Sequence, residues 1–584
     1  MRFLGNVLAT VIGIFVFMML SFFGIILIGV IFGGDSETVE VENNSVIELN
    51  LSDISDDYAG KYSDPWVTAF SERKKIGLTD VINAIEIAET DDAIKGISIL
   101  NTNSSLGMAQ SKELRDALNR FKKSGKFIYS YANSYSQKEY YLNSVATSIY
   151  INPIGELDFK GLSTEVMFFK DFQEKSGLKM EVIRHGKYKS AVEPFLENKM
   201  SDANKEQTMA LLNGIWTNIV EDISKSRNIP VEKLNTIANG LLARTPEMAK
   251  AQNLIDYIAY EDVYHNAIRK VLKVDKDEDY NTVSIADYTQ KTTTTSVNMD
   301  SNDAIAIVYA QGEIGSGEGD VNEIGEGSMR RSLQEARKDD DIKAIVLRIN
   351  SPGGSALTSD LIWREIELTK RVKPVVVSMG NYAASGGYYI NANTIFAEKN
   401  TITGSIGVFG TLPNFSVAAN RYGINTEQVR THENASNYSP FVPMDEKFKA
   451  ITLEGVENIY ATFIGHVAEG RKMTTAQVDA IGQGRVWTGS EAVKIGLVDK
   501  IGGLREAIAE AAKLAKIKSY STVNYPEYEK NFEDIFANFP FAKSKMAFIK
   551  EEIGEENYQL LQEIKRIKQR KGIQAIMPFE ISIQ

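Results

Sequence analysis

The sequence predicts an α/β fold that occurs twice along the chain, and three observations support this prediction. Short apolar runs such as 304–310 (AIAIVYA) and 342–349 (IKAIVLRI) are typical of buried strands. Segment 357–371 is amphipathic and lies between two such runs, as a helix that connects parallel strands would. Segment 91–100 (DDAIKGISIL) resembles segment 339–348 (DDDIKAIVLR), which begins 248 positions later.

Further matches extend this repeat over most of the chain. EYYLN at 139–143 corresponds to GYYIN at 387–391, again 248 positions later. EVIRHGKYKSAVEPF at 181–195 aligns without a gap with EQVRTHENASNYSPF at 427–441, at an offset of 246. The offset between the repeats falls only from 248 to 246, as short insertions and deletions in loops would cause. Two unrelated α/β domains would not match in a common register, so we expect a tandem duplication with a largely parallel sheet in each copy.

These matches divide the chain into four expected segments. Residues 1–34 form an N-terminal membrane anchor, 44–286 the first repeat and 304–525 the second repeat. Residues 526–584 are expected to form a C-terminal helical extension. The junction between the repeats is expected at 287–303, which includes the low-complexity run KTTTTS.

The anchor is predicted from an uncharged apolar run at 7–32, which exceeds the about 20 residues that span a bilayer. Arg2 precedes this run, and acidic residues follow it at positions 35, 37, 40 and 42. The positive-inside rule then places the N-terminus in the cytoplasm and the body across the membrane. A cleaved signal peptide is the alternative, but its apolar core of about 7–15 residues would be shorter.

Composition excludes several classes of function. The 584-residue chain carries a net charge of −12, which argues against a nucleic-acid binder, and we interpret its one basic cluster, 565–571, as a solvated helix face. The chain has no cysteine, and no two of its four histidines have the spacing of a zinc-binding helix. The glycine-rich segment 312–327 lacks the G-K-[ST] of a P-loop. We therefore expect no metal, nucleotide or other cofactor.

Two short motifs of the second repeat suggest hydrolytic chemistry. GNYAASGGYYI at 380–390 follows an apolar strand and places Ser385 near the start of an expected helix, with two glycines leaving the approach open. NSPGGS at 350–355 follows another strand, and the N–H groups of Gly353 and Gly354 suit an oxyanion hole. Taken alone, the serine is equally explained as a helix N-cap and SPGG as a plain turn.

The two repeats differ at these motifs in a complementary way. The counterpart of Ser385 in the first repeat is Gln137, and the counterpart of SPGG is NSSL at 103–106. Conversely, Lys189 of the first repeat corresponds to Ala435 of the second. Each repeat therefore lacks what the other keeps, which predicts one composite site built from both.

A lysine in such a site would act as a general base, for which it must be neutral. Its ordinary pKa of about 10.4 must then fall by several units, which burial in an apolar pocket achieves. Lys189 has suitable apolar neighbours at positions 188, 191, 192 and 195. Lys187 corresponds to Glu433 and also differs between the repeats, so spacing alone leaves both lysines as candidates.

Several motifs together resemble one family. YKSAVEPF, SPGG, AASGGYY, ITGSIGVFG at 402–410 and G-x-V-x-T-G at 484–489 closely resemble signal peptide peptidase A, in its long, duplicated, membrane-anchored form. The resemblance covers nearly the whole chain, including the C-terminal GIQAIMPFEISIQ. It implies two domains similar to the Clp protease and crotonase group and a serine protease with a Ser/Lys dyad. By motif, Ser385 would be the nucleophile and Lys189, rather than Lys187, the general base.

The resemblance also implies the remaining parts of the site and its setting. Gly354 and the backbone at Gly386 would form the oxyanion hole, and Ser405 would orient the lysine. The substrates would be apolar signal peptides left in the inner (cytoplasmic) membrane after secretion, with a homotetrameric catalytic body on the periplasmic side. A crotonase-like acyl-CoA enzyme is one alternative, disfavoured because coenzyme A is cytoplasmic. A non-catalytic membrane scaffold of the same fold is the other, disfavoured by the joint presence of Ser385, Lys189 and Gly354.

Overall fold

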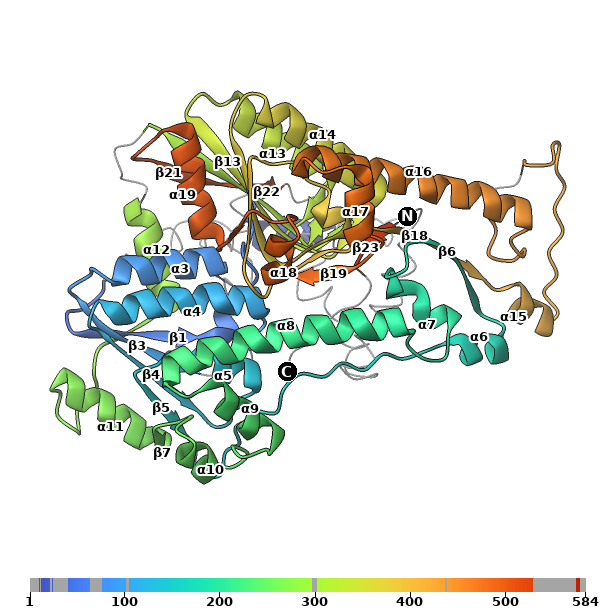
Figure 1. The fold of residues 1–584 in the computed structure, drawn as a ribbon. Helices are drawn as coiled ribbons and strands as arrows, with labels where there is room; N and C mark the ends of the chain where they lie inside the picture. Colours follow the sequence, from blue (N-terminus) through green and yellow to red (C-terminus); the bar gives the residue numbers. More distant parts are fainter. Residues whose placement is uncertain are drawn as a thin grey trace.

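The protein folds as two α/β halves that lie against each other, coloured blue to green and yellow to red in Figure 1. The structure is a computed structural model, and it describes residues 10, 12–21, 24, 40–62, 76–100, 104–296, 302–435, 438–528 and 574–577. Each half contains a mainly parallel sheet, and a third sheet joins the halves. The α/β class and its duplication, predicted from the apolar runs and the repeat, are therefore confirmed.

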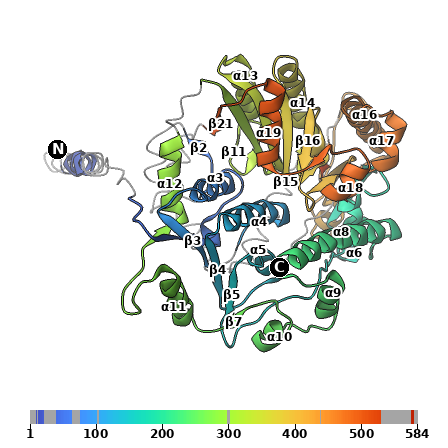
Figure 2. The same cartoon turned by 60° about the vertical axis from the view of Figure 1, so that its left-hand side comes forward.

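The sheet of the first half is entirely parallel, with the strand order β7-β5-β4-β3-β1-β8. Its strands are apolar because helices cover both faces. Helices α3, α4 and α12 lie on one side of the sheet and α11 lies on the other (Figure 2). The bounds are β1 (Ser45–Asn50), β3 (Ile94–Leu100), β4 (Phe127–Ala132), β5 (Ser148–Ile151), β7 (Tyr257–Ile258), β8 (Thr282–Ser284), α3 (Leu78–Ala88), α4 (Met108–Lys123), α11 (Glu261–Leu272) and α12 (Ile285–Ser296).

The sheet of the second half has the order β19-β17-β15-β13-β9-β21, with β16 beside β15 and β20 beside β16. All of its pairings are parallel except that of β19 with β17. Helix α19 covers one face, and α13 and α14 cover the other. The bounds are β9 (Ala304–Gln311), β13 (Ile342–Ser351), β15 (Val375–Ala384), β16 (Thr394–Ala397), β17 (Ile402–Gly404), β19 (Val486–Thr488), β20 (Lys500–Ile501), β21 (Ser521–Tyr525), α13 (Glu326–Lys338), α14 (Ala356–Lys370) and α19 (Leu504–Ala515).

The duplication is visible in the helices that follow each sheet. The long helices α8 (Asp202–Arg227) and α16 (Glu446–Arg471) both have 26 residues and occupy equivalent places in the two repeats. The shorter elements are η1 (Leu51–Asp53), β2 (Lys61–Tyr62), α5 (Gln137–Asn143), α6 (Lys170–Ser176), η2 (Ser190–Val192), α7 (Glu193–Leu196), α9 (Val231–Asn239), α10 (Pro246–Ala251), α15 (Ser416–Arg421), α17 (Thr475–Ile481), α18 (Gly489–Lys494) and β22 (Glu527–Tyr528).

The third sheet joins the two repeats, with the order β11-β12-β10-β14-β23-β18-β6. Strand β6 belongs to the first repeat and pairs antiparallel with β18 of the second along seven residues, from Val408 opposite His185 to Asn414 opposite Lys179. This ladder carries the lysine-bearing segment of the first repeat to the motifs of the second. The bounds are β6 (Lys179–His185), β10 (Glu313–Ile314), β11 (Gly319–Asp320), β12 (Glu323–Ile324), β14 (Gly353–Ser355), β18 (Val408–Asn414) and β23 (Gln574–Ile576).

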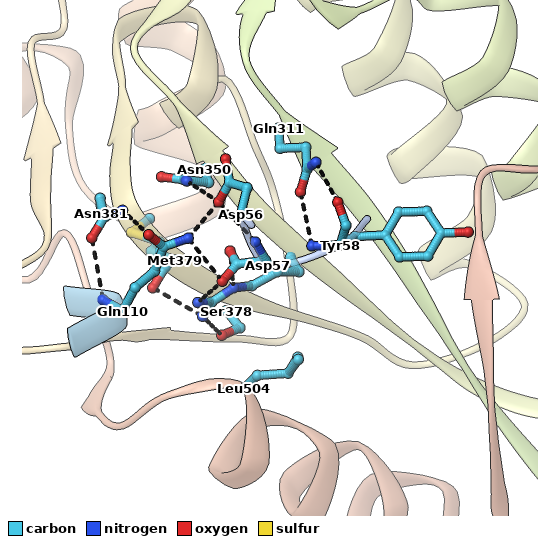
Figure 3. Close-up of polar contacts among 12 residues, drawn as sticks. Asp56, Asp57, Tyr58, Gln110, Gln311, Asn350, Ser378, Met379, Asn381 and Leu504 are labelled. Atoms are coloured by element: carbon cyan, nitrogen blue, oxygen red, sulfur yellow. Dashed lines mark hydrogen bonds and ion pairs between the residues drawn. The ribbon is translucent and has the colours of Figure 1, made fainter. Parts of the chain in front are cut away.

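A buried ionic network also holds the repeats together (Figure 3). Arg348 on β13 donates both Nε and Nη2 to the carboxylate of Asp57, at 2.8 and 2.9 Å, and Nη2 also donates to Glu113 on α4, at 2.6 Å. All three side chains are buried. Next to them, Asn350 donates to Asp56 at 2.8 Å, and Asn350 lies three residues before the first glycine of SPGG. The network therefore ties the strand that leads to SPGG to the first repeat.

Three expectations about the chain's organisation concern its two ends and the junction between the repeats. The junction expected at 287–303 is partly structured, because α12 packs against α3 and β1 of the first repeat. Most of the anchor at 7–32 lies outside the described residues, and within the described part of the chain no helix is long and apolar enough to cross a membrane. The extension at 526–584, including the basic cluster 565–571, also lies largely outside them, and its described residues contribute strands β22 and β23.

Candidate active site

Ser385 follows directly on β15 and begins a single 3-10 turn, η3 (Ser385–Tyr388). Its φ of +56° is in the left-handed region, which residues other than glycine seldom adopt and which is found disproportionately at functional sites. The side chain is fully buried. The expectation that an amphipathic helix begins here is wrong, since the chain makes only one turn. Negative charge near Ser385 must therefore be stabilised by individual N–H groups rather than by a helix dipole.

Lys189 lies four residues beyond β6 and is fully buried. The N–H of Tyr188 donates to the Gln483 carbonyl at 2.9 Å, which fixes the lysine segment against the second repeat. Two glycines make room for the side chain. A Cβ on Gly407 would lie 3.2 Å from Lys189 Cδ, and one on Gly484 would lie 2.7 Å from its Cα. Larger residues at these positions would displace the lysine.

The structure brings Lys189 and Ser385 into direct contact, with 2.8 Å between Nζ and Oγ. Lys189 Nζ also lies 3.1 Å from the Ser405 carbonyl oxygen and 3.0 Å from Ser405 Oγ. A neutral amine has two N–H donors and one lone pair. If both donors are directed to Ser405, the lone pair is left facing the Ser385 hydroxyl.

The environment of Lys189 favours its neutral form. Burial lowers the pKa of the Lys189 amine well below its ordinary value, because removal from water penalises the ammonium ion. Among the described residues no carboxylate forms an ion pair with this lysine that would oppose the effect. Lys187, by contrast, is exposed and lies over the ring of Tyr188. Burial thus distinguishes two lysines that spacing alone left equivalent.

The SPGG loop places the predicted oxyanion glycines beside the serine. The N–H of Gly353 donates to Ser351 Oγ at 3.2 Å and is therefore already engaged. A Cβ built on Gly386 would lie 3.3 Å from the Gly354 nitrogen, so these two glycines face each other. A Cβ on Gly354 would overlap the Ile314 carbonyl oxygen. Only glycine fits at Gly354 without moving the backbone of β10.

The counterparts of the site in the other repeat have different roles. Gln137, in the place of Ser385, accepts hydrogen bonds from the N–H groups of Lys160 and Gly161, each at 3.0 Å. It also donates to the Gly161 carbonyl at 3.1 Å. Ala435, in the place of Lys189, lies in an exposed loop. The first repeat has therefore replaced the serine with a residue that stabilises a loop, and the second has no buried group where the first has its lysine.

A small apolar cavity adjoins the serine turn. Its volume is about 30 Å³, and Gly386 and Gly387 form part of its wall. The remaining lining is almost entirely apolar and comes from β9, β10, β12, β13, α13, α14 and the segment after η3: Ala310, Ile314, Ile324, Met329, Leu347, Ile349, Ser359, Ile362, Ile366, Tyr389 and Ile390. A cavity of this size and polarity suits one small apolar side chain.

Sequence reasoning named Ser385, Lys189, Ser405, Gly354 and Gly386, and the structure places all five in one cluster. It did not assign the packing role of Gly407 and Gly484, although both lie in motifs that resemble the family. It also gave no role to the C-terminal strand β23, which lies between β14 and β18.

Comparison with known proteins agrees with this arrangement. The model of peptidase family S49 matches residues 120–275 and 367–518, one match in each repeat. The chain belongs to peptidase family S49. Because it belongs to this family, the chain is a serine protease and not an acyl-CoA enzyme or a non-catalytic scaffold.

The S49 chain is similar to several curated proteins over most of its length. It is 35% identical to Protease 4 of Haemophilus influenzae, covering 84% of this chain and 82% of that protein. It is 36% identical to Protease 4 of Salmonella typhi, with coverages of 77% and 74%. It is 33% identical to the chloroplastic serine protease SPPA of Arabidopsis thaliana, with coverages of 82% and 70%.

One solved structure, a mutant of ClpP1 from Listeria monocytogenes, is 17% identical and covers 38% of this chain and 98% of its own. Its TM-score of 0.24 is too low to establish a common fold. The similarity of each repeat to the Clp protease and crotonase group therefore stays a prediction.

Proposed function

We propose that this S49 peptidase hydrolyses peptide bonds with a Ser/Lys dyad whose two members come from different repeats. The observation that carries the proposal is the 2.8 Å contact between Lys189 Nζ and Ser385 Oγ, both of them buried. Neutral Lys189 accepts the hydroxyl proton as Ser385 attacks the peptide carbonyl. The resulting ammonium protonates the leaving amine, and water then hydrolyses the acyl-enzyme with Lys189 again as base.

The other residues of the cluster assist this reaction. The N–H groups of Gly354 and Gly386 stabilise the oxyanion of the tetrahedral intermediate. Ser405 fixes the position of the amine through its carbonyl and hydroxyl oxygens, at 3.1 and 3.0 Å. These contacts orient the lone pair of the lysine, so Ser405 is a positioning residue. No part of this mechanism uses a metal or cofactor.

We further propose that the substrates are signal peptides left in the membrane after secretion. Two features support this substrate class: the small apolar cavity beside Ser385 and the uncharged apolar run at 7–32. That run would anchor the chain in the inner membrane by a single span, with its N-terminus in the cytoplasm and the catalytic body on the periplasmic side. Anchoring keeps the site close to apolar peptides that seldom leave the bilayer.

Cleavage of a membrane-inserted peptide tests this function. Full-length enzyme and its Ser385→Ala variant would be reconstituted into liposomes that contain a synthetic apolar signal peptide, and fragments would be identified by mass spectrometry. We expect the wild type to cut within the apolar segment next to small residues, and the variant to leave the peptide intact. Equal or faster cleavage of a soluble polar peptide of the same length would contradict the proposed substrate class.

We also propose that the chain assembles as a homotetramer through two strand edges. Within the chain, β18 of the second repeat pairs with β6 of the first. The segment of the first repeat that corresponds to β18 and the segment of the second that corresponds to β6 have no strand partner among the described residues. The equivalent of β18 is 162–168, an extended segment whose side chains at 163, 165 and 167 are exposed. The equivalent of β6 is 425–431, where Val429 is 98% exposed. If 162–168 of one copy paired with 425–431 of the next, the backbone N–H and C=O groups of both edges would be hydrogen-bonded.

A charge placed on this edge is expected to weaken the assembly. In detergent, Val429→Asp should shift the sedimentation velocity of the full-length protein from a tetramer to smaller species, because the carboxylate would be buried at the new interface. Val372→Asp is the matched control, since Val372 is 64% exposed and lies far from both edges in the sequence. A tetrameric Val429→Asp variant, or a monomeric wild type, would contradict the proposed interface.

A further inference from the structure

Helix α8 runs along the boundary between the two repeats, where it contacts α9 of the first repeat and β19 of the second (Figure 1). In its second turn Gln207 is buried, with 1% of its surface exposed. The side-chain amide of Gln207 donates to the Tyr188 carbonyl at 3.0 Å and to Ser190 Oγ at 2.9 Å. These two acceptors belong to the residues on either side of Lys189. One side chain of α8 therefore holds the chain both before and after the proposed base.

The same turn is also held from the second repeat. The N–H of Tyr188 donates to the Gln483 carbonyl at 2.9 Å, so the N–H and the carbonyl of Tyr188 are bound by different repeats. Fixing the residue before Lys189 on both sides sets the direction in which the lysine side chain leaves the backbone. In that direction Lys189 Nζ reaches Ser385 Oγ at 2.8 Å. The position of the base thus depends on the contact between α8 and the turn.

Gln207 leaves one of its own polar atoms unsatisfied. Its amide oxygen Oε1 is buried and has no hydrogen-bond partner among the described residues. The opposite orientation of the amide would set this oxygen against the Tyr188 carbonyl, so the contact to Tyr188 fixes the amide as it stands. A buried acceptor without a partner lowers stability, and proteins keep such features mainly at functional sites. Stability of the fold alone therefore does not explain this glutamine.

Comparison of the two repeats separates this contact from those that only stabilise the fold. Helices α8 and α16 align over all 26 residues. Arg227 and Arg471 occupy the same position in this alignment, and each forms an ion pair with an aspartate of its own repeat, at 2.8 and 2.6 Å. Gln207 corresponds to Ile451, whose side chain is 53% exposed. The structural ion pair is present in both repeats, whereas the glutamine occurs only in the repeat that has the lysine.

A second amide supports Gln207 in the same way. Asn204, one turn earlier on α8, accepts from Gln207 Nε2 at 3.3 Å and donates to the carboxylate of Glu193 at 2.5 Å. Glu193 is buried and begins α7, four residues after Lys189. The counterpart of Asn204 in α16 is Phe448, so this polar pair also belongs only to the first repeat. The hydrogen bonds of α8 thus extend along the whole lysine segment, 188–193.

We propose that Gln207 is a positioning residue for the general base, and that its amide keeps the Lys189 amine directed at Ser385 and shielded from water. This inference rests on the proposed function, because it takes Lys189 to be the base. It goes beyond that function by assigning a role to a side chain that touches neither the substrate nor the reacting atoms. Without the amide, the Tyr188 carbonyl and the Ser190 hydroxyl lose their shared donor, and the turn is free to move.

Loss of the Gln207 amide should have two measurable effects. A displacement of about 1 Å at a catalytic group can lower the rate by about 10²-fold, so kcat should fall. KM should change little, because the contacts that bind the substrate stay in place. Movement of the turn would also admit water to the Lys189 amine. Burial lowers the pKa of Lys189, and hydration favours the ammonium ion, so the pH at which kcat rises should move upward.

The charges around the turn do not provide another cause for such a shift. The groups in contact with the Lys189 side chain are uncharged: Ser385, Ser405, Gly407, Gly484 and the ring of Phe409. Titratable side chains of the turn and of the elements packed against it are Arg184 and His185 on β6, Lys187, Tyr188, Glu193 on α7, Glu206 on α8 and Arg485. Substitution of Gln207 changes none of them. A shift in the pH profile would therefore report on the burial of the base.

Steady-state kinetics over a range of pH tests the proposal. Full-length wild type, Gln207→Met and Gln137→Met would be assayed in mild detergent on an apolar fluorogenic peptide, and their thermal unfolding would be measured. Methionine keeps the length of glutamine but lacks the amide. Gln137→Met is the matched control, because Gln137 is also a buried glutamine of the first repeat, but its amide binds the backbone of another loop, at Lys160 and Gly161.

We expect Gln207→Met to lower kcat by about 10-fold or more, to leave KM within about twofold, and to move the rise of kcat to higher pH. Gln137→Met should keep the kcat and the pH profile of the wild type, even where it unfolds at a lower temperature. A wild-type profile in Gln207→Met would overturn the positioning role. Equal changes in the two variants would also overturn it, because they would show a general loss of stability.

Two further variants complete the test. If Gln207→Met does not fold, Ser190→Ala takes its place, since it removes one of the two acceptors of the amide. It should move the profile in the same direction by less, and a wild-type profile would overturn the proposal. Lys189→Ala separates this inference from the proposed function. Activity that survives in Lys189→Ala would overturn the dyad, whereas activity that needs Lys189 but not Gln207 would overturn this inference alone.

Discussion

Replacing Lys189 with alanine is expected to lower kcat for peptide hydrolysis by about 10³-fold or more, since a positioned general base typically contributes about 10²–10⁴-fold. The reason is geometric as well as electronic. Lys189 Nζ is 2.8 Å from Ser385 Oγ. Without the lysine amine, the Ser385 hydroxyl has no base to accept its proton, and the leaving amine has no proton donor. Steady-state kinetics of the full-length variant on an apolar fluorogenic peptide measures the effect.

Lys187→Ala is the matched control for this prediction, because Lys187 lies two residues away but is exposed. It should keep kcat within about twofold, as most surface substitutions have little effect. The pH dependence gives an independent readout. Burial lowers the pKa of Lys189, so the neutral base becomes available as the pH rises, and activity should level off well below the about 10.4 of an ordinary lysine. Full activity in Lys189→Ala would contradict the dyad.

Replacing Arg348 with methionine is expected to lower the free energy of unfolding by about 3–5 kcal/mol, the usual cost of removing one partner from a buried ion pair. Arg348 is 1% exposed and joins two carboxylates of the first repeat to a strand of the second. Its removal leaves Asp57 and Glu113 buried without their cation. Burial already raises the pKa of Glu113, and the arginine opposes that effect. Urea denaturation in detergent, followed by tryptophan fluorescence, measures the loss.

The control for Arg348 is a surface arginine in a similar pair. Arg505 contacts Glu86 at 3.0 Å, but its side chain is 56% exposed. Exposed pairs typically contribute about 0–1 kcal/mol, so Arg505→Met should have little effect. If both variants unfold alike, the Arg348 network does not hold the repeats together. Because Asn350 lies next to the network and just before SPGG, Arg348→Met should also lower kcat at temperatures where it stays folded.

Much of the fold follows from local sequence pattern. The apolar runs at 304–310 and 342–349 correspond to β9 and β13, and the amphipathic segment 357–371 to α14. The spacing of apolar residues and the local composition indicate such strands and helices directly. The duplication was equally visible, because two copies in register cannot arise by chance. Their complementary differences pointed to a composite site before any geometry was known.

The rest depends on contacts between residues far apart in the chain, which local periodicity does not encode. The pairing of β6 with β18 joins residues more than 200 positions apart. The Arg348 network likewise joins isolated charged residues in separate elements, each of which is ordinary by itself. The helix expected at Ser385 is only one turn, since the small residues that allow close packing there disfavour a longer helix. Strand β23 is too short to be recognised by its sequence pattern, so only its pairing with β14 and β18 reveals where it lies.

The most direct test of the central claim is the rate at which Ser385 itself is acylated. Wild type and Lys189→Ala would be treated with a peptidyl acylating reagent, and the modified residue would be identified by mass spectrometry at several times. We expect Ser385 to be modified in the wild type, faster as the pH rises, and the rate of modification to fall by about 10²-fold or more in Lys189→Ala. Acylation at another serine, or equal rates in the two proteins, would show that the buried pair shared by the repeats is not the catalytic dyad.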